Sequence, residues 1–209
     1  MKKNTLITLL IFFYTFDIFA NEPKFDQIIN GLDNPWSLTF VNNDELLITE
    51  KSGNLLLVNL SNKNIRKIKH NLNILEDGQG GLLEVLYYKD QVFVSYTEDQ
   101  KKGYSSTSVA KGEFNDLELN FQNIFSAKPP INSGYHFGSR LVIKDDFIYI
   151  TAGERGEGMI AQDPKKHPGS IIRIHLDGRI PKDNPKFKDK KDWLPEIFQI
   201  GVRNPQGMD

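Results

Sequence analysis

Short apolar runs rich in Ile, Leu, Val, Phe and Tyr recur along this chain, separated by Asn, Asp and Gly turn residues. Runs of this length predict β-strands, and no window holds a sustained helical period. The expected strands are 36–41, 45–51, 54–60 and 65–69, then 81–88, 91–97, 107–114 and 119–125, then 139–144, 147–152, 170–176 and 195–200. Each group of four opens about 45 to 60 residues after the last, the period of four-stranded propeller blades. We therefore predict an all-β propeller, with a Greek-key sandwich as the alternative and residues 178–193 as an exposed loop.

The first residues have the features of an export signal. Lys2 and Lys3 give a positive start, an apolar run covers residues 6–16, and Ala20 precedes a polar segment. The run is too short for a comfortable membrane span. We expect residues 1–20 to be a signal peptide, residues 21–209 to be a partial propeller domain, and the protein to be periplasmic or secreted. An uncleaved anchor and a buried first strand stay open as alternatives.

Composition excludes several kinds of chemistry. The formal net charge of -1 gives no electrostatic argument for a nucleic-acid partner. The chain has no cysteine, which excludes disulfides, thiol catalysis and thiolate metal sites. No His-x-x-x-His pattern or carboxylate cluster indicates a zinc or iron site. His70, His167 and His175 rank low as functional residues, because their strand or turn contexts offer no polar partner in the sequence.

Polar residues recur where a propeller builds its site, on the face where the connections into the innermost strands converge. Asn34, Gln79 and His136 each come shortly before the first strand of a group. Arg203 and Asn204 should precede the first strand of a fourth group. These residues are expected to occupy equivalent places and to point toward one axis.

Two more candidates follow the second strand of the third group, which places Glu154 and Arg155 on the same face. Each candidate also has a structural interpretation. Gln79 would complete a tight turn, His136 would be a hydrogen-bonded structural histidine, and Arg203 would pair with Glu154. Residue types and spacing alone leave both interpretations open.

Eight motifs carry a family resemblance. They are LDNPWSLTF, LLITEKSG, GQGGLLEV, HFGSRLVI, YITAGERG, AQDPKKHPGSIIRI, GRIPKDNP and GVRNPQGM, in this order from about residue 31 to the end. With them the chain resembles the glucose/sorbosone dehydrogenase family, most closely its soluble aldose sugar dehydrogenases that use pyrroloquinoline quinone (PQQ). The resemblance implies a six-bladed β-propeller that binds PQQ together with calcium.

The resemblance also implies roles for single residues. His136 falls on the family's catalytic base, and Gln79 on an amide that faces cofactor and substrate. Arg203 and Asn204 fall on a pair that contacts the quinone, and Glu154 matches a carboxylate close to the histidine. The implied reaction oxidises an aldose at its anomeric carbon to a lactone, with hydride transfer to PQQ and an unknown physiological electron acceptor.

The family continues for about as much again beyond Asp209, and that continuation is where the calcium ligands are expected. We therefore expect three to four blades of an incomplete ring, inactive as a fragment. Two other classes stay open. One is a non-catalytic extracellular propeller that acts as a binding module, and the other is a calcium-dependent propeller that hydrolyses lactones.

Overall fold

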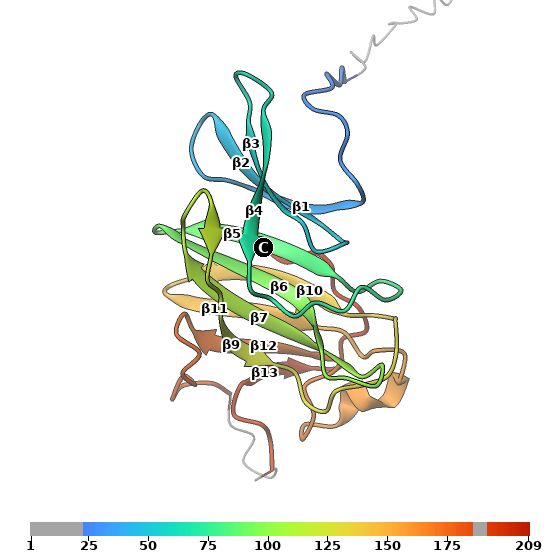
Figure 1. Cartoon of the computed structure of the whole chain (residues 1–209). Helices are drawn as coiled ribbons and strands as arrows, with labels where there is room; N and C mark the ends of the chain where they lie inside the picture. The colour runs from blue at the N-terminus through green and yellow to red at the C-terminus, as the bar shows by residue number, and fades with distance from the viewer. Residues whose placement is uncertain (1–22, 186–191) are drawn as a thin grey trace, which may run out of the picture.

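The chain folds into three sheets, seen in a computed structural model that describes residues 23–185 and 192–209 (Figure 1). The expected signal peptide, residues 1–20, lies outside these ranges. Blade one is β1 (Pro35–Phe40), β2 (Glu45–Glu50), β3 (Leu55–Asn59) and β4 (Ile65–His70), extended by the short β8 (Glu118–Leu119). Blade two is β5 (Leu82–Tyr88), β6 (Gln91–Asp99), β7 (Ser105–Glu113) and β9 (Gln122–Ser126). Blade three is β10 (Gly138–Lys144), β11 (Phe147–Ala152), β12 (Ser170–His175) and β13 (Ile197–Ile200), with a 3₁₀ helix η1 (Gly158–Gln162) between β11 and β12.

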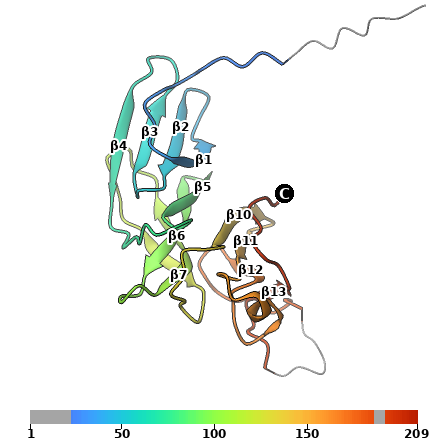
Figure 2. The ribbon, with the colours of Figure 1, turned by 90° about the vertical axis from the view of Figure 1, so that its right-hand side faces the viewer.

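The strands of each blade follow one another along the chain as an antiparallel meander. The innermost strands β1, β5 and β10 lie together and face the C-terminal end of the chain (Figure 2). Consecutive meanders packed face to face around an axis form a β-propeller. The prediction of an all-β propeller is confirmed, and the Greek-key alternative is wrong.

Apolar side chains fill the two spaces between the blades. The first cluster includes Leu47, Leu55 and Ile68 of blade one and Leu82 and Val94 of blade two. A second cluster lies between blades two and three, and Phe93, Val109, Leu141, Ile148 and Ile172 belong to it. Because β-branched and leucine side chains pack well between twisted sheets, these clusters explain why the apolar runs of the sequence form these strands.

A buried hydroxyl group joins each blade to the next in the same way. Thr49, Ser95 and Thr151 occupy matching positions in the second strands. Each hydroxyl oxygen accepts a hydrogen bond from an inner-strand N–H of its own blade. Each hydroxyl also donates to a carbonyl of the next inner strand or, for Thr151, of the segment that follows β13. The partners are Ser37 N and Leu83 O for Thr49, Glu84 N and Ser139 O for Ser95, and Arg140 N and Pro205 O for Thr151. The blades therefore share a structural repeat that their overall sequences do not display.

This repeat sets the equivalence between blades. Pro205 takes the position that Leu83 and Ser139 take in blades two and three. The residue two places before each of these carbonyl groups is Arg203, Gly81 or Phe137, so these three are equivalent. Gln79 lies two residues before Gly81, and His136 lies one residue before Phe137. The expectation that the polar candidates occupy strictly equivalent places is therefore wrong by one or two positions. They share the same end of the inner strands, but the connections that carry them differ in shape.

Three polar side chains meet on the inner strands: Ser37 of β1, Glu84 of β5 and Arg140 of β10. The Ser37 hydroxyl donates to Glu84, whose other carboxylate oxygen pairs with the Arg140 guanidinium. We call this group the inner-strand polar cluster. It borders a hollow of about 460 Å³ that Trp36 and Ile48 also line. Burial raises the pKa of Glu84, and the hydrogen bond from Ser37 and the charge of Arg140 only partly offset this effect.

The expected strand 119–125 is two separate strands. β8 leaves blade two and pairs in parallel with β4 of blade one, whereas β9 pairs with β7. The chain turns between them because the Asn71 side chain both donates to Phe121 O at 3.1 Å and accepts from Phe121 N at 2.8 Å. Leu119 of β8 is fully buried.

The expected exposed loop 178–193 is partly wrong as well. Asn184 is buried, and its amide donates to Arg173 O and Pro195 O while accepting from the Arg173 guanidinium. This amide fixes the beginning of the segment to blade three. Residues 186–191 lie outside the described ranges.

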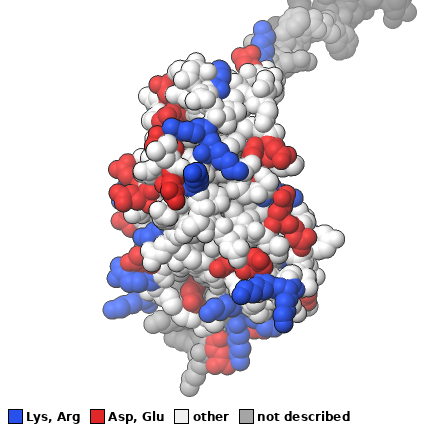
Figure 3. All heavy atoms as spheres, in the orientation of Figure 1, with Lys and Arg blue, Asp and Glu red and all other residues white. Residues whose placement is uncertain are grey.

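The face seen in Figure 3 carries Lys and Arg side chains interspersed with Asp and Glu. Within the described ranges, the structure contains no helix with the length and apolar character that a membrane crossing needs.

Candidate active site

His136 lies on the connection into β10, with its backbone in the left-handed region at φ 50°. A residue other than glycine is uncommon there, and the strain is tolerated when the surroundings hold the backbone in place. The imidazole is 16% exposed, and its Nδ1 pairs with Oε1 of Glu154, which is 4% exposed. The two residues come from different connections of blade three, as the propeller pattern predicts.

Glu154 is held on both of its carboxylate oxygens. Oε1 faces His136, and Oε2 accepts the backbone N–H of Gly158 at 3.1 Å. Burial raises the pKa of Glu154, but hydrogen bonds from His136 and from the N–H groups of Gly158 and Gly156 lower it by more. The net pKa lies below the ordinary value, so the carboxylate is ionised at neutral pH. An ionised acceptor at Nδ1 keeps a proton on that nitrogen and leaves Nε2 free to act as a base.

Gln79 and Asn204 hold the backbone on either side of the imidazole. Gln79 Oε1 accepts the N–H of His136 at 2.9 Å, and Asn204 Oδ1 accepts the N–H of Gly138 at 3.0 Å. Both amides therefore have a structural role, which sequence reasoning kept open for Gln79 only. Because both use their oxygens for this purpose, their NH₂ groups remain available as donors to a ligand.

Arg203 lies on the same face, with its Nε 3.8 Å from Glu154 Oε1 and its side chain 78% exposed. Its backbone O accepts the N–H of Glu154 at 2.8 Å. The predicted pairing with Glu154 is present, but the long distance and high exposure make it weak. The guanidinium therefore keeps donors for a planar or anionic ligand.

Two glycines let the connections approach closely. A Cβ atom at Gly153 would collide with His136 O, and a Cβ atom at Gly78 would collide with Gly134 O. The N–H of Gln79 also donates to Gly134 O at 2.8 Å. The connections that carry Gln79, His136 and Glu154 are thus packed backbone against backbone.

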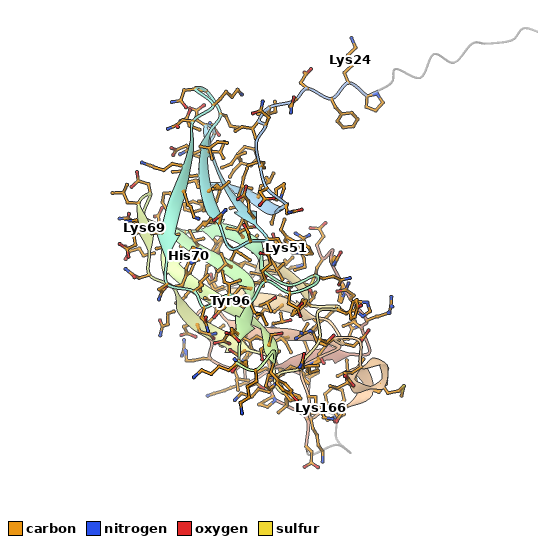
Figure 4. All side chains as sticks on the ribbon, turned by 45° about the vertical axis from the view of Figure 1, so that its right-hand side comes forward. Lys24, Lys51, Lys69, His70, Tyr96 and Lys166 are labelled. Carbon is orange, nitrogen blue, oxygen red and sulfur yellow. The ribbon has the colours of Figure 1, made fainter. Side chains whose placement is uncertain are left out.

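The remaining candidates lie differently. Asn34 is exposed, and its amide donates to the neighbouring Asp33. Arg155 is buried beneath the His136 connection. Lys51 was not among the candidates from the sequence. This residue follows the second strand of blade one, just as Glu154 follows the second strand of blade three. Its Nζ donates to Gly78 O at 2.6 Å, at the boundary of blades one and two (Figure 4).

Two of the low-ranked histidines have polar partners, contrary to expectation. His70 Nε2 lies 2.8 Å from Gly53 O, beside blade two (Figure 4). His167 Nδ1 accepts the N–H of Lys128 at 3.0 Å, and its Nε2 lies 3.6 Å from Glu196. Most of these partners are backbone groups, which no side-chain pattern reveals. Among the described residues, no group of three or more His, Asp or Glu side chains is arranged to hold a metal ion.

The blades bring a histidine–carboxylate pair, two amides and an exposed arginine to one end of their inner strands. This arrangement defines a β-propeller with a cluster of polar side chains on one face. The sequence model of the glucose/sorbosone dehydrogenase family matches residues 32–209. The chain belongs to that family, which confirms the resemblance found in its motifs.

Relatives of known name agree with this assignment. The chain is 34% identical over 187 residues to aldose sugar dehydrogenase YliI of Escherichia coli, covering 85% of this chain and 50% of that protein. It is 26% identical over 227 residues to quinoprotein glucose dehydrogenase B of Acinetobacter calcoaceticus, covering 90% and 46%. The crystal structure of the soluble aldose sugar dehydrogenase from E. coli in the apo form matches with a TM-score of 0.82 at 32% identity, covering 88% of this chain and 56% of that one. The chain spans about half the length of the curated relatives it matches.

Proposed function

We propose that this chain is part of an oxidoreductase that oxidises aldose sugars at the anomeric carbon to lactones, with PQQ as hydride acceptor. The observation that carries the proposal is the pair formed by His136 Nδ1 and the buried carboxylate of Glu154. The family membership and the names of the relatives support the substrate class and the quinone.

In the proposed reaction, His136 Nε2 takes the proton from the anomeric hydroxyl of the sugar. Glu154 stabilises the imidazolium that forms, because its carboxylate is ionised and contacts Nδ1. Gln79 keeps the imidazole in place through the backbone N–H of His136. Exclusion of water from the closed site would strengthen each of these interactions.

The polar side chains at the site fit a planar, anionic quinone. The Arg203 guanidinium is exposed and only weakly paired, and the amides of Gln79 and Asn204 have NH₂ donors left. We propose that these three residues hold PQQ, which supplies a two-electron acceptor when bound. Arg203 would stabilise negative charge on an oxygen of the bound ligand. Calcium would be held by ligands outside the described residues.

A non-catalytic binding module is the second candidate. It is favoured by the backbone hydrogen bonds of Gln79 and Asn204, because these bonds give both amides a use without a cofactor. The histidine–carboxylate pair favours the enzyme, because a base poised next to an ionised carboxylate serves proton transfer.

The proposed function can be tested with the protein purified from its host and with the 209-residue chain alone. Supplied with PQQ, calcium, an aldose and an artificial electron acceptor, the host protein should form the lactone, and omission of PQQ should abolish the reaction. The chain alone should be inactive, because Arg203 is 78% exposed and water competes for its contacts. PQQ binding by the host protein without sugar oxidation would contradict the enzyme and support the binding module. Oxidation by a monomer of the chain alone would contradict its expected inactivity.

We also propose that the protein is exported to the periplasm or secreted, on the basis of Lys2, Lys3, the apolar run and Ala20. Mass spectrometry of the protein from its native host should find a mature N-terminus near Asn21. A cytoplasmic protein with an intact Met1 would contradict the proposal.

A further inference from the structure

Arg155 is a buried arginine whose guanidinium is surrounded by backbone carbonyl groups. Nε donates to Tyr135 O at 3.1 Å, and Nη1 donates to Ser105 O at 2.9 Å. Nη2 donates to the Ser105 hydroxyl at 2.9 Å, to Ile131 O at 3.5 Å and to Ser133 O. Three of these acceptors belong to residues 131–135, the connection that leads directly into His136.

The same residue contacts His136 and the residue after it. The Arg155 guanidinium carbon lies 3.7 Å from the centre of the Phe137 ring, and its backbone N–H donates to His136 O at 3.3 Å. Arg155 therefore fixes the chain before, at and after the imidazole. Its position directly after Glu154 ties both members of the histidine–carboxylate pair to one short segment.

The charge of this guanidinium is costly to bury. Burial lowers the pKa of Arg155 to about 10, although the charge of Asp77 raises it, so the side chain stays protonated at neutral pH. An apolar side chain of similar length would fill the same volume without this desolvation cost. What only arginine provides is a rigid fork of donors that can bond several carbonyl groups at once.

We propose that Arg155 is a positioning residue, which locks the connection 131–137 so that His136 Nδ1 stays on Glu154. The catalytic meaning of this assignment rests on the proposed function, but the positioning itself does not. Without the guanidinium, Ser133 O and Tyr135 O lose their donor, while Ile131 O keeps only the N–H of Ser105. The imidazole then becomes free to leave the carboxylate.

Blade three offers a matched control in Arg173. It is also buried, its guanidinium carbon lies 3.8 Å from the Phe147 ring centre, and it bonds Asp183 and Asn184. None of these contacts involves the His136 connection. Arg173→Met should therefore lower stability without changing the imidazole.

The experiment labels the histidines of the chain with ¹⁵N and records long-range ¹H–¹⁵N spectra at neutral pH. The chain has four histidines, and the signal that His136→Asn removes identifies His136. The unaltered chain and Arg173→Met should show a His136 proton held on Nδ1, facing Glu154. Arg155→Met should show an averaged pair of ring nitrogen shifts, with a fall in unfolding temperature similar to that of Arg173→Met. If Arg155→Met fails to fold, Arg155→Lys keeps the charge without the fork and should show the same averaging.

In the active protein, the Arg155 variants should lower kcat at least about tenfold with little change in KM, as expected for a misplaced base. An unchanged Nδ1 tautomer in a folded Arg155 variant would overturn the proposal and leave only a structural role. Absence of sugar oxidation in the unaltered protein would instead overturn the proposed function, and the tautomer measurement would still decide the positioning.

Discussion

Replacement of His136 by asparagine should lower the turnover of the active protein by about a hundredfold or more, the scale of a lost general base. Asparagine adopts the left-handed backbone of this position more readily than most residues, so the change removes the imidazole with little added strain. PQQ binding should survive, because the residues proposed to hold it are Gln79, Arg203 and Asn204. Steady-state kinetics at saturating PQQ, with a separate titration of PQQ binding, measure the two effects.

His175→Gln is the matched control. His175 is half-buried in β12 of the same blade, and its ring contacts Phe147 with centroids 4.8 Å apart. This variant should keep turnover within about twofold, since in the described part of the chain His175 contacts none of the site residues and substitutions away from such features usually cost little stability. Near-normal turnover in His136→Asn, with PQQ saturated, would remove the histidine from its proposed role.

Replacement of Arg140 by methionine should lower the free energy of unfolding by about 2 to 3 kcal/mol at pH 7. Removal of one partner from a buried ion pair costs about 3 to 5 kcal/mol, because the remaining charge is left without compensation. We expect the smaller loss of about 2 to 3 kcal/mol because this pair is not fully buried: the Arg140 side chain is 30% exposed, whereas that of Glu84 is 4% exposed. Urea unfolding measures the change. The surface pair of Arg66 and Asp116 supplies the control, and Arg66→Met should cost less than about 1 kcal/mol.

The loss in Arg140→Met should depend on pH. Burial raises the pKa of Glu84 above its unfolded value, and Arg140 is one of the groups that lower it. Without Arg140 the folded pKa rises further, so folding favours the protonated carboxyl more strongly and loses stability as pH rises through that pKa. The difference between Arg140→Met and the unaltered chain should therefore shrink between pH 7 and about pH 4.5. The double variant with Glu84→Gln should recover most of the loss at pH 7. Two results would contradict the conclusion that the ion pair of Arg140 and Glu84 stabilises the fold. One is that Arg140→Met loses the same free energy of unfolding at both pH values, and the other is that it loses no more than Arg66→Met loses.

Local sequence predicted most of the strands because their apolar runs end at turn residues. β2 and β6 lie within a residue or two of their predicted bounds for this reason. β8 could not be predicted, because two residues carry no period and become a strand only by pairing with β4. The hydroxyl repeat of Thr49, Ser95 and Thr151 left a signal, a small hydroxyl residue in the same part of each second strand, that a search for matching residue types would have found.

The candidate site was predictable where side chains meet and unpredictable where backbone groups do. Strand order and family motifs together placed His136 and Glu154 on one face, and the structure brings them into contact. Sequence reasoning also placed Arg155 on that face, whereas its guanidinium turns inward to carbonyl groups. A carbonyl group is present in every residue, so no residue type in the sequence marks the acceptors of a buried arginine.

The pairing of β8 with β4 makes the first two blades inseparable as modules. β4 is the outer strand of blade one, and its free edge receives residues 118–119 from a connection that belongs to blade two. The amide of Asn71 and the ion pair of Arg66 with Asp116 fasten the same connection. A gene fragment cut between β4 and β5 would therefore encode a sheet with an exposed, unpaired edge, which invites pairing with other chains. Duplication or exchange of blade one alone would meet the same obstacle.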